Sequence, residues 1–261
     1  MTATAVPTVK KEITPAQVDE LKRQMQADAG HGVSTKVEDV IVPQIHVLQP
    51  LSPEVLDGPA TVSGARPGDF LMGVEIVPGR TGFWFQLCAV TQLWLEFKPI
   101  DSGGGFVASY PFTSEGEPPL GAKRYEKMRL RFESGNECIH YRQFCGVAWR
   151  NGGGLEYVIP FKSTGHTVAK TWMMEAGRAN RFPDGRAPPL YGHIWKLTTS
   201  QRKNASGQWY VVDVSAPLIL TDPDAAKVVG DPTHAYLMGR ALANAFEVGE
   251  KVAEVDRVVD A

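Results

Sequence analysis

The sequence predicts a mainly β protein of α+β type, with two or three helices added to the strands. Of its 261 residues, 43% are hydrophobic, which is enough for a substantial core. Nineteen prolines and 26 glycines separate short apolar runs, a composition typical of many strands and turns. No run approaches the ~18–20 apolar residues of a membrane span, and the N-terminus lacks a signal-peptide pattern. We therefore expect a cytoplasmic protein without membrane contacts.

Three segments are expected along the chain. Residues 1–36 should form a tail and a short helix, because Thr14 suits the helix N-cap and Pro15 suits its first turn. Residues 37–230 contain nearly all strand-like runs and should form the β-rich domain. Residues 231–261 should form a C-terminal helix and a mildly acidic tail.

Strand-like segments recur through the β-rich domain. Prolines interrupt residues 37–70, which therefore read as edge segments and turns. Aromatic and β-branched runs indicate core strands further on, and the turn RKNASG indicates that the last two pair as a hairpin. The core strands are expected at residues 73–78, 82–99, 138–149, 155–161, 190–199 and 208–215. Helices are expected at residues 164–180 and 232–255.

Basic charge is concentrated in the middle of the chain. Residues 122–203 have fifteen Lys and Arg against six acids, a local charge of +9 in a protein whose net charge is −2. The same segment holds eleven of the 24 aromatic residues. Cations bind phosphates and flat rings stack on unpaired bases, so this composition is typical of a surface for single-stranded nucleic acid. A solvated basic face over an aromatic core is the alternative interpretation.

The clearest local pattern lies in residues 123–133 (KRYEKMRLRFE). Lys127, Arg129 and Arg131 alternate with apolar residues, so a single strand would present the three cations on one face. The basic hairpin tip adds Arg202 and Lys203. The candidate nucleic-acid-binding residues are Lys123, Arg124, Lys127, Arg129, Arg131, Arg142, Lys162, Lys170, Arg202 and Lys203, with Tyr125, Tyr141, Trp149 and Tyr191 as candidate base-stacking residues.

Two further segments have alternative interpretations. Ser163 or Thr164 is expected to cap the helix at 164–180, and its N-terminus with Lys162 and His166 would suit one phosphate. Ordinary capping explains the same residues. Residues 111–121 (PFTSEGEPPLG) form an acidic, proline-rich loop that reads as a flap or an insertion.

The sequence contains no strong catalytic signature. It lacks the GxSxG, HExxH, CxxC and Walker motifs. Cys138, His140 and Cys145 do not have the spacing of a familiar zinc site, and three cysteines form no even disulfide framework. We therefore expect no enzymatic activity, no cofactor and no metal.

Two sequence segments resemble those of a family of tailed-bacteriophage proteins. The first is VPQIHVLQPLSPEV followed by PGDF, and the second is YVIPFKSTGHTVAKTW followed by GQWYVVDV. The family is often encoded among replication and recombination genes. The resemblance implies an OB-fold-like Greek-key barrel that binds single-stranded DNA, acting in the host cytoplasm. One departure is the C-terminus, where Asp256 and Asp260 stand among valines, unlike the strongly acidic tails through which such proteins contact polymerases or helicases.

The predicted function is therefore sequence-independent binding of single-stranded DNA in phage replication or recombination. The alternative is a virion component, such as a head or tail accessory protein whose extended N-terminal half covers its neighbours. A DNA-processing enzyme such as a nuclease is a third, weaker candidate. Self-association, contacts with replication or recombination proteins, and the choice between DNA and RNA stay open at this stage.

Overall fold

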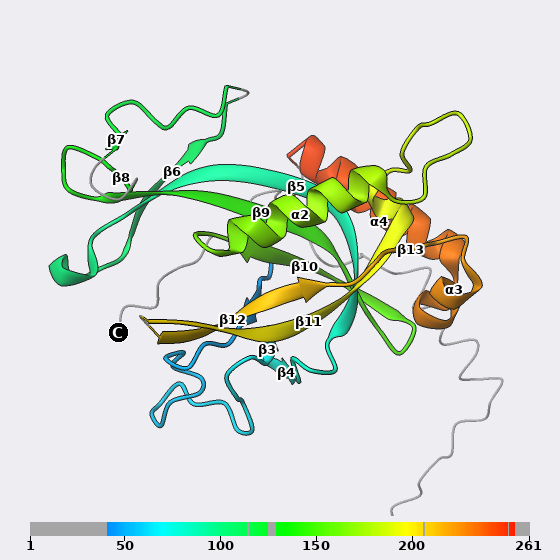
Figure 1. Cartoon of the computed structure of the whole chain (residues 1–261), viewed down its shortest axis with the longest axis horizontal. Coiled ribbons are helices and arrows are strands. Elements are labelled where there is room, and N and C mark those ends of the chain that lie inside the picture. Colours follow the sequence, from blue (N-terminus) through cyan, green and yellow to red (C-terminus); the bar gives the residue numbers. More distant parts are fainter. Residues whose placement is uncertain (1–40, 114, 125–128, 206, 250, 254–261) are drawn as a thin grey trace, which may run out of the picture. The chain divides into compact units, whose positions relative to one another are not determined.

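Two long antiparallel strands, β5 (Phe83–Phe97) and β9 (Glu137–Arg150), form the centre of the fold (Figure 1). Both are rich in aromatic and β-branched residues, which favour a pleated and half-buried surface. Their register runs from Trp84 opposite Trp149 to Phe97 opposite Glu137, with an irregularity between Leu87 and Ala89. Because bulges of this kind increase local twist, the irregularity helps the sheet to curl.

The computed structural model describes residues 41–253 except residues 114, 125–128, 206 and 250. These residues belong to one compact unit. The predicted N-terminal tail and the helix predicted to begin at Thr14 lie outside the described residues.

The main sheet has nine strands in its described part, all paired antiparallel, and it curls into a half-barrel (Figure 1). Its order is β12-β11-β5-β9-β8-β7, while β10 pairs with β9, β6 with β5 and β13 with β11. The strands beside β5 and β9 are β6 (Phe106–Pro111), β7 (Lys123–Arg124), β8 (Leu130–Arg131), β10 (Gly153–Phe161), β11 (His193–Asn204), β12 (Gly207–Val214) and β13 (Leu218–Ile219). The predicted class, a mainly β protein with an OB-fold-like Greek-key barrel and two or three added helices, is confirmed as to class, since a curled antiparallel half-barrel is accompanied by helices.

Two smaller sheets and two short 3-10 helices complete the β structure. The first sheet is antiparallel and has the order β2-β3-β4; the second pairs β1 and β14 in parallel. Their bounds are β1 (Ile41–Val42), β2 (Ile45–Val47), β3 (Phe70–Met72), β4 (Glu75–Val77) and β14 (Val252–Ala253). The 3-10 helices are η2 (Ile100–Ser102) and η4 (Leu190–Gly192).

Helix α2 (Gly165–Arg178) packs on one face of the half-barrel, as the prediction for residues 164–180 anticipated. Trp172 is 1% exposed, and its ring lies 5.0 Å from Phe144, 5.7 Å from Trp195 and 6.0 Å from Phe85, measured between ring centroids. Thr164 occupies the N-cap position, but no side chain caps the helix. The packing of Trp172, rather than a capping side chain, therefore fixes α2 on the sheet.

Helices α3 (Pro223–Val229) and α4 (Pro232–Glu247) pack on the opposite face, around Trp84 and Trp149. Each begins with an Asp-Pro pair whose aspartate accepts backbone N–H bonds at the N-cap. The helix predicted at 232–255 is therefore present but ends at Glu247, because the chain turns through Gly249 (φ 75°) and continues into β14. None of the helices in residues 41–253 is long and apolar enough to cross a membrane.

The continuous strand predicted at residues 123–133 is wrong. The segment contains two short antiparallel strands, with Lys123 opposite Arg131 and Arg124 opposite Leu130. A chain that folds back on itself cannot keep period-two alternation across the turn. The expected row of three cations on one strand face is therefore absent from the described part of this segment, and Lys127 lies outside it.

Candidate nucleic-acid interface

A column of rings lies where the N-terminus of α2 meets the sheet. The His140 ring is stacked between Phe112, at 4.7 Å and 16°, and His166, at 4.8 Å and 20°. Trp94 lies 4.9 Å from His140 and 5.8 Å from Phe112, again between ring centroids. Two long cationic side chains, from β9 and α2, accompany the rings. We call the whole group the cationic ring cluster; its members are Trp94, Phe112, His140, Arg142, His166 and Lys170.

Strand register and helix period together assemble this cluster. Trp94 lies opposite His140 across β5 and β9, and Arg142 follows two residues later on the same sheet face. His166 Nε2 donates a hydrogen bond to the His140 backbone carbonyl at 2.9 Å, which fixes the first turn of α2 over β9. Lys170 is one helical turn further along α2. Trp94 and Lys170, which are 76 positions apart in the sequence, thereby belong to the same cluster.

The pKa values of the two histidines lie below the ordinary histidine value. Burial lowers the pKa of His140 to about 4, and His166, Arg142 and Lys170 lower it further by electrostatic repulsion. Burial also lowers the pKa of His166; Arg142 and Lys170 add to this, whereas the bond to the His140 carbonyl opposes it. In the described part of the chain, no carboxylate is among the groups that shift either pKa. The cluster therefore has an uncompensated positive field.

Three buried nitrogen atoms of the cluster have no hydrogen-bond partner among the described residues. They are Trp94 Nε1, Arg142 Nε and His166 Nδ1. Neither Arg142 nor Lys170 forms an ion pair within the same residues. A buried donor without a partner costs free energy, and Arg142 Nε and Trp94 Nε1 are obligatory donors. The cluster is thus equipped to receive an acceptor that the chain does not supply, such as a phosphate oxygen.

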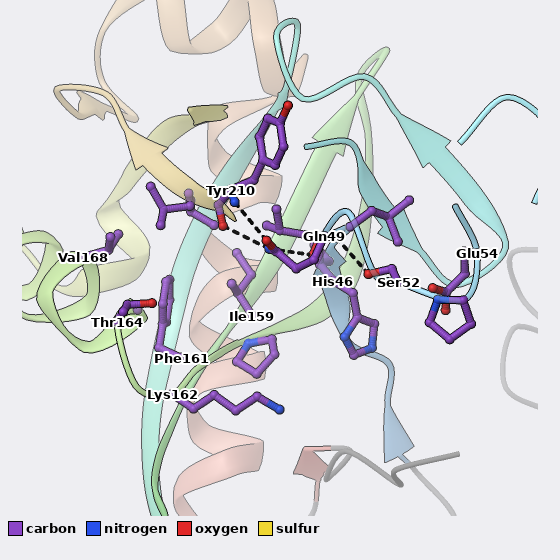
Figure 2. A pocket seen from close by; sticks show the side chains of 18 residues that line it. His46, Gln49, Ser52, Glu54, Ile159, Phe161, Lys162, Thr164, Val168 and Tyr210 are labelled. Atoms are coloured by element: carbon purple, nitrogen blue, oxygen red, sulfur yellow. Dashed lines mark hydrogen bonds between the residues drawn. The ribbon is translucent and has the colours of Figure 1, made fainter. Parts of the chain in front are cut away.

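A pocket of about 440 Å³ lies on the other side of the first turn of α2 (Figure 2). Thr164 and Val168 line it from α2, and the Lys162 side chain extends along its margin. The Gln49 amide accepts from the Tyr210 backbone N–H at 2.9 Å and donates to its carbonyl at 3.0 Å. A side chain therefore takes the place of a neighbouring strand at the free edge of β12. We call this space, where the half-barrel stays open between β10 and β12, the seam pocket.

The predicted cations thus divide into separate places. Arg142 and Lys170 meet in the cationic ring cluster, and Lys162 lies at the seam pocket. The β11–β12 hairpin forms as predicted, with Leu197 opposite Val214 at one end and Asn204 opposite Gly207 at the other. Two more predicted cations, Arg202 and Lys203, are exposed near its tip; Arg202 is 3.5 Å from the Asp213 carboxylate.

The cations of the β7–β8 hairpin are largely compensated by acids. Lys123 lies 2.9 Å from Glu133, and the Glu137 carboxylate lies 3.4 Å from Arg131 and 3.8 Å from Arg129. The groove that these arginines were expected to line therefore has less free charge than the sequence indicates. Arg124 is exposed in β7, whereas Tyr125 and Lys127 lie outside the described residues.

Three of the four predicted stacking residues have described positions, and two of these positions require a correction. Tyr141 is 0% exposed and Trp149 is 2% exposed, with Trp149 Nε1 donating to Gln86 at 3.1 Å. Both rings lie in the core: Trp149 packs against α3 and α4, whereas Tyr141 packs with Leu95 and Phe97 of β5 and donates its hydroxyl to Gln44. Tyr191 is half-buried and packs 5.2 Å from Tyr236 of α4, on the sheet face opposite the cationic ring cluster. None of these three rings belongs to the cluster.

Sequence reasoning missed the rings that do assemble. Trp94 was assigned to a core strand, and Phe112 begins the acidic loop that was read as a flap. Two signals existed: His140 and Arg142 share strand parity, and His166 and Lys170 are four residues apart. Neither signal shows that the strand and the helix meet.

The three cysteines, Cys88, Cys138 and Cys145, are buried and unpaired. Burial raises the pKa of Cys138 to about 11 and that of Cys145 to about 12, so both thiols stay protonated at neutral pH. Within the described residues, no group of three His, Cys, Asp or Glu side chains is placed to hold a metal ion.

Comparison with protein families identifies the origin of the chain. A family model described as Pam3 phage gp34-like protein matches residues 10–251. The chain belongs to the Pam3 phage gp34-like protein family. It is therefore a phage protein, and the match to this gp34-like family includes every residue of the cationic ring cluster and of the seam pocket. No curated protein and no solved structure matches the chain.

Proposed function

We propose that this phage protein binds single-stranded DNA with little sequence preference, without catalysing a reaction, during phage DNA replication or recombination. The observation that carries the proposal is the cationic ring cluster. Its unpaired Arg142 and Lys170 side chains suit phosphates, and its rings suit bases that are not held in a duplex. Membership in a phage protein family supports the setting.

The proposed path of the strand crosses the first turn of α2. The cationic ring cluster lies on one side of this turn and Lys162, at the seam pocket, lies on the other. Arg202 and Lys203, on the exposed end of the β11–β12 hairpin, provide a second set of phosphate contacts. An OB-like curled sheet with a projecting hairpin is a scaffold that single-stranded DNA-binding proteins commonly use.

A fluorescence-anisotropy titration tests the proposal. Labelled oligo(dT) and a duplex of equal length are titrated with the purified protein across a series of salt concentrations. We expect tight binding of the single strand, weak binding of the duplex, and an affinity that falls as salt rises, with a log–log slope of about −0.7 per phosphate contact. Equal binding of both substrates, or an affinity that does not depend on salt, would contradict it.

A second candidate is a head or tail component of the virion. Large apolar side chains are exposed on three separate loops: Leu51 is 82% exposed, Val74 is 94% exposed and Leu120 is fully exposed. Neighbouring subunits of a particle would bury such side chains. This candidate predicts that the protein co-sediments with phage particles and has no affinity for free strands, the reverse of the first proposal.

A further inference from the structure

Phe112 is the aromatic neighbour of His140 that comes from a loop, whereas Trp94 belongs to β5 and His166 to α2. His166 stacks on His140 at 4.8 Å and 20°, and Phe112 stacks on it at 4.7 Å with an interplanar angle of 16°. Phe112 also lies 5.8 Å from Trp94 at 23°. A near-parallel ring at this separation has the geometry of a base stacked on an aromatic side chain.

The loop that follows Phe112 resembles a nucleotide in its chemistry. Glu115 and Glu117 are exposed three and five residues after the ring, so a flat apolar group is followed by anionic groups. The cluster beneath has Arg142 and Lys170, neither of them in an ion pair within the described residues. The Phe112 ring thus lies where a nucleobase would stack, and Arg142 and Lys170 are left for the phosphates of a DNA strand.

Phe112 and Ala122, near the two ends of this loop, pack in one apolar cluster with Trp94, Phe132 and Cys138. In residues 112–122, Ser114 apart, the described backbone hydrogen bonds beyond regular strands join Gly116 to Thr113 and Ala122 to Pro119, both within the loop. The preceding Tyr110, by contrast, donates to the Glu96 carboxylate at 2.5 Å, which holds β6 firmly. Phe112 is half-buried, so exchanging its ring for another flat group costs little packing.

We propose that the place of the Phe112 ring on His140 is a nucleobase-binding site that the protein's own acidic loop fills until single-stranded DNA replaces it. This inference rests on the proposed function. A base takes the position of Phe112, its phosphates contact Arg142 and Lys170, and Phe112 moves away from His140 with the loop that follows it. The chain thereby favours strands that have unpaired bases over other polyanions, because only a base can displace the ring.

Replacement of the ring tests this site. Phe112→Ala and Phe112→Leu are titrated by anisotropy with labelled oligo(dT) and with an abasic strand of equal length. Phe106→Ala is the matched control, because Phe106 is an exposed ring of β6 that packs on Phe97. Both Phe112 variants should bind oligo(dT) about two- to tenfold more tightly than the wild type, the value of one aromatic stack. Neither variant should gain affinity for the abasic strand.

Other outcomes overturn the inference in distinct ways. A loss of oligo(dT) affinity would show that Phe112 itself stacks on DNA, and an equal gain for both strands would show that only the loop charges matter. No change in either Phe112 variant would remove the site while leaving the proposed function intact, provided that the wild type still binds oligo(dT). If the wild type binds no single strand at all, the proposed function itself has failed. Thermal denaturation of each variant confirms that it is folded.

Discussion

Two pairs of arginine and lysine side chains from the same basic segment have opposite electrostatic surroundings. Arg129 and Arg131, beside β8, share the Glu137 carboxylate at 3.8 and 3.4 Å. Arg142 and Lys170 are close enough to His140 to lower its pKa, and they form no ion pair among the described residues. The first pair has the more regular sequence pattern, yet the second pair has the free charge.

This difference shows that a cation contributes to binding through its surroundings rather than through its number. Exposed pairs such as Arg129 and Glu137 are screened by water and salt, and the acid offsets their attraction for phosphate. At the cluster, partial burial weakens screening, so a phosphate would interact more strongly with Arg142. The histidines add positive charge only when they bind a proton.

The largest expected effect concerns α2, the helix that positions Lys170 of the second pair. Trp172→Ala should lower the free energy of unfolding by ~3–5 kcal/mol, because it leaves a cavity between α2 and the sheet. It should also weaken DNA binding, since His166 and Lys170 depend on α2 for their positions. Urea denaturation measures the first effect. Met174→Ala, at an exposed position of the same helix, is the control and should change stability by less than ~0.5 kcal/mol.

Loss of the unpaired arginine should have the next largest effect. Arg142→Gln should lower the affinity for oligo(dT) about 10- to 100-fold, because a charge-assisted bond to phosphate disappears. The log–log salt slope should decrease by about 0.7. Arg131→Gln is the matched control from the other pair and should change affinity less than about twofold. Similar losses in both variants would contradict the distinction between the two regions.

A pH series should reveal the histidines of the cluster. A bound phosphate favours protonated His140 and His166, whose pKa values are low in the free protein, so affinity should rise as pH falls from 7 to 5. Stability should change in the opposite direction. Between pH 6.5, the ordinary pKa, and pH 4, the approximate pKa of His140 in the folded protein, the unfolded chain binds more protons at His140 than the folded chain does. The free energy of unfolding therefore decreases as the pH is lowered.

Anisotropy and urea denaturation at constant ionic strength measure the two pH effects. His166→Gln should reduce the pH dependence of binding, whereas His234→Gln, at an exposed position of α4, should leave it unchanged. A pH dependence that persists undiminished in His166→Gln would place the titrating group elsewhere.

The smallest expected effect comes from the carboxylate of the first pair. Glu137→Gln removes the acid that Arg129 and Arg131 share, so affinity for oligo(dT) should rise about twofold at low salt and not at high salt. The same titration measures it. A rise as large as the loss in Arg142→Gln would mean that the β8 arginines form the main contact.

Much of the fold was predictable because it depends on local patterns. Strands β5, β9 and β10 and the β11–β12 hairpin follow from aromatic and β-branched runs between glycine-rich turns. Helix α2 follows from its apolar period, and α4 from its Asp-Pro start. The β7–β8 hairpin was missed because alternation over eleven residues does not reveal a turn within it.

The candidate site was only partly predictable. Arg142 and Lys170 were named from composition, but Tyr141 and Trp149 were expected to stack on bases and lie in the core instead. Period two assigns neighbouring residues to opposite sheet faces, yet it does not say whether a helix covers each face. Here α3 and α4 cover Trp149, whereas Leu95, Phe97 and Gln44 cover Tyr141, so strand parity alone does not identify an exposed ring on this part of β9.

The sequence by itself determined the local features of this phage protein: the strand and helix segments, the concentration of positive charge at residues 122–203, and the acidic loop. These depend on side-chain period, turn residues and composition within short windows. Only the tertiary structure decided which cations keep their charge and which rings lie beside them. Arg142, His166 and Phe112 meet because β5–β9 register, the packing of Trp172 and the end of β6 coincide at one place. Such long-range contacts depend on the whole fold.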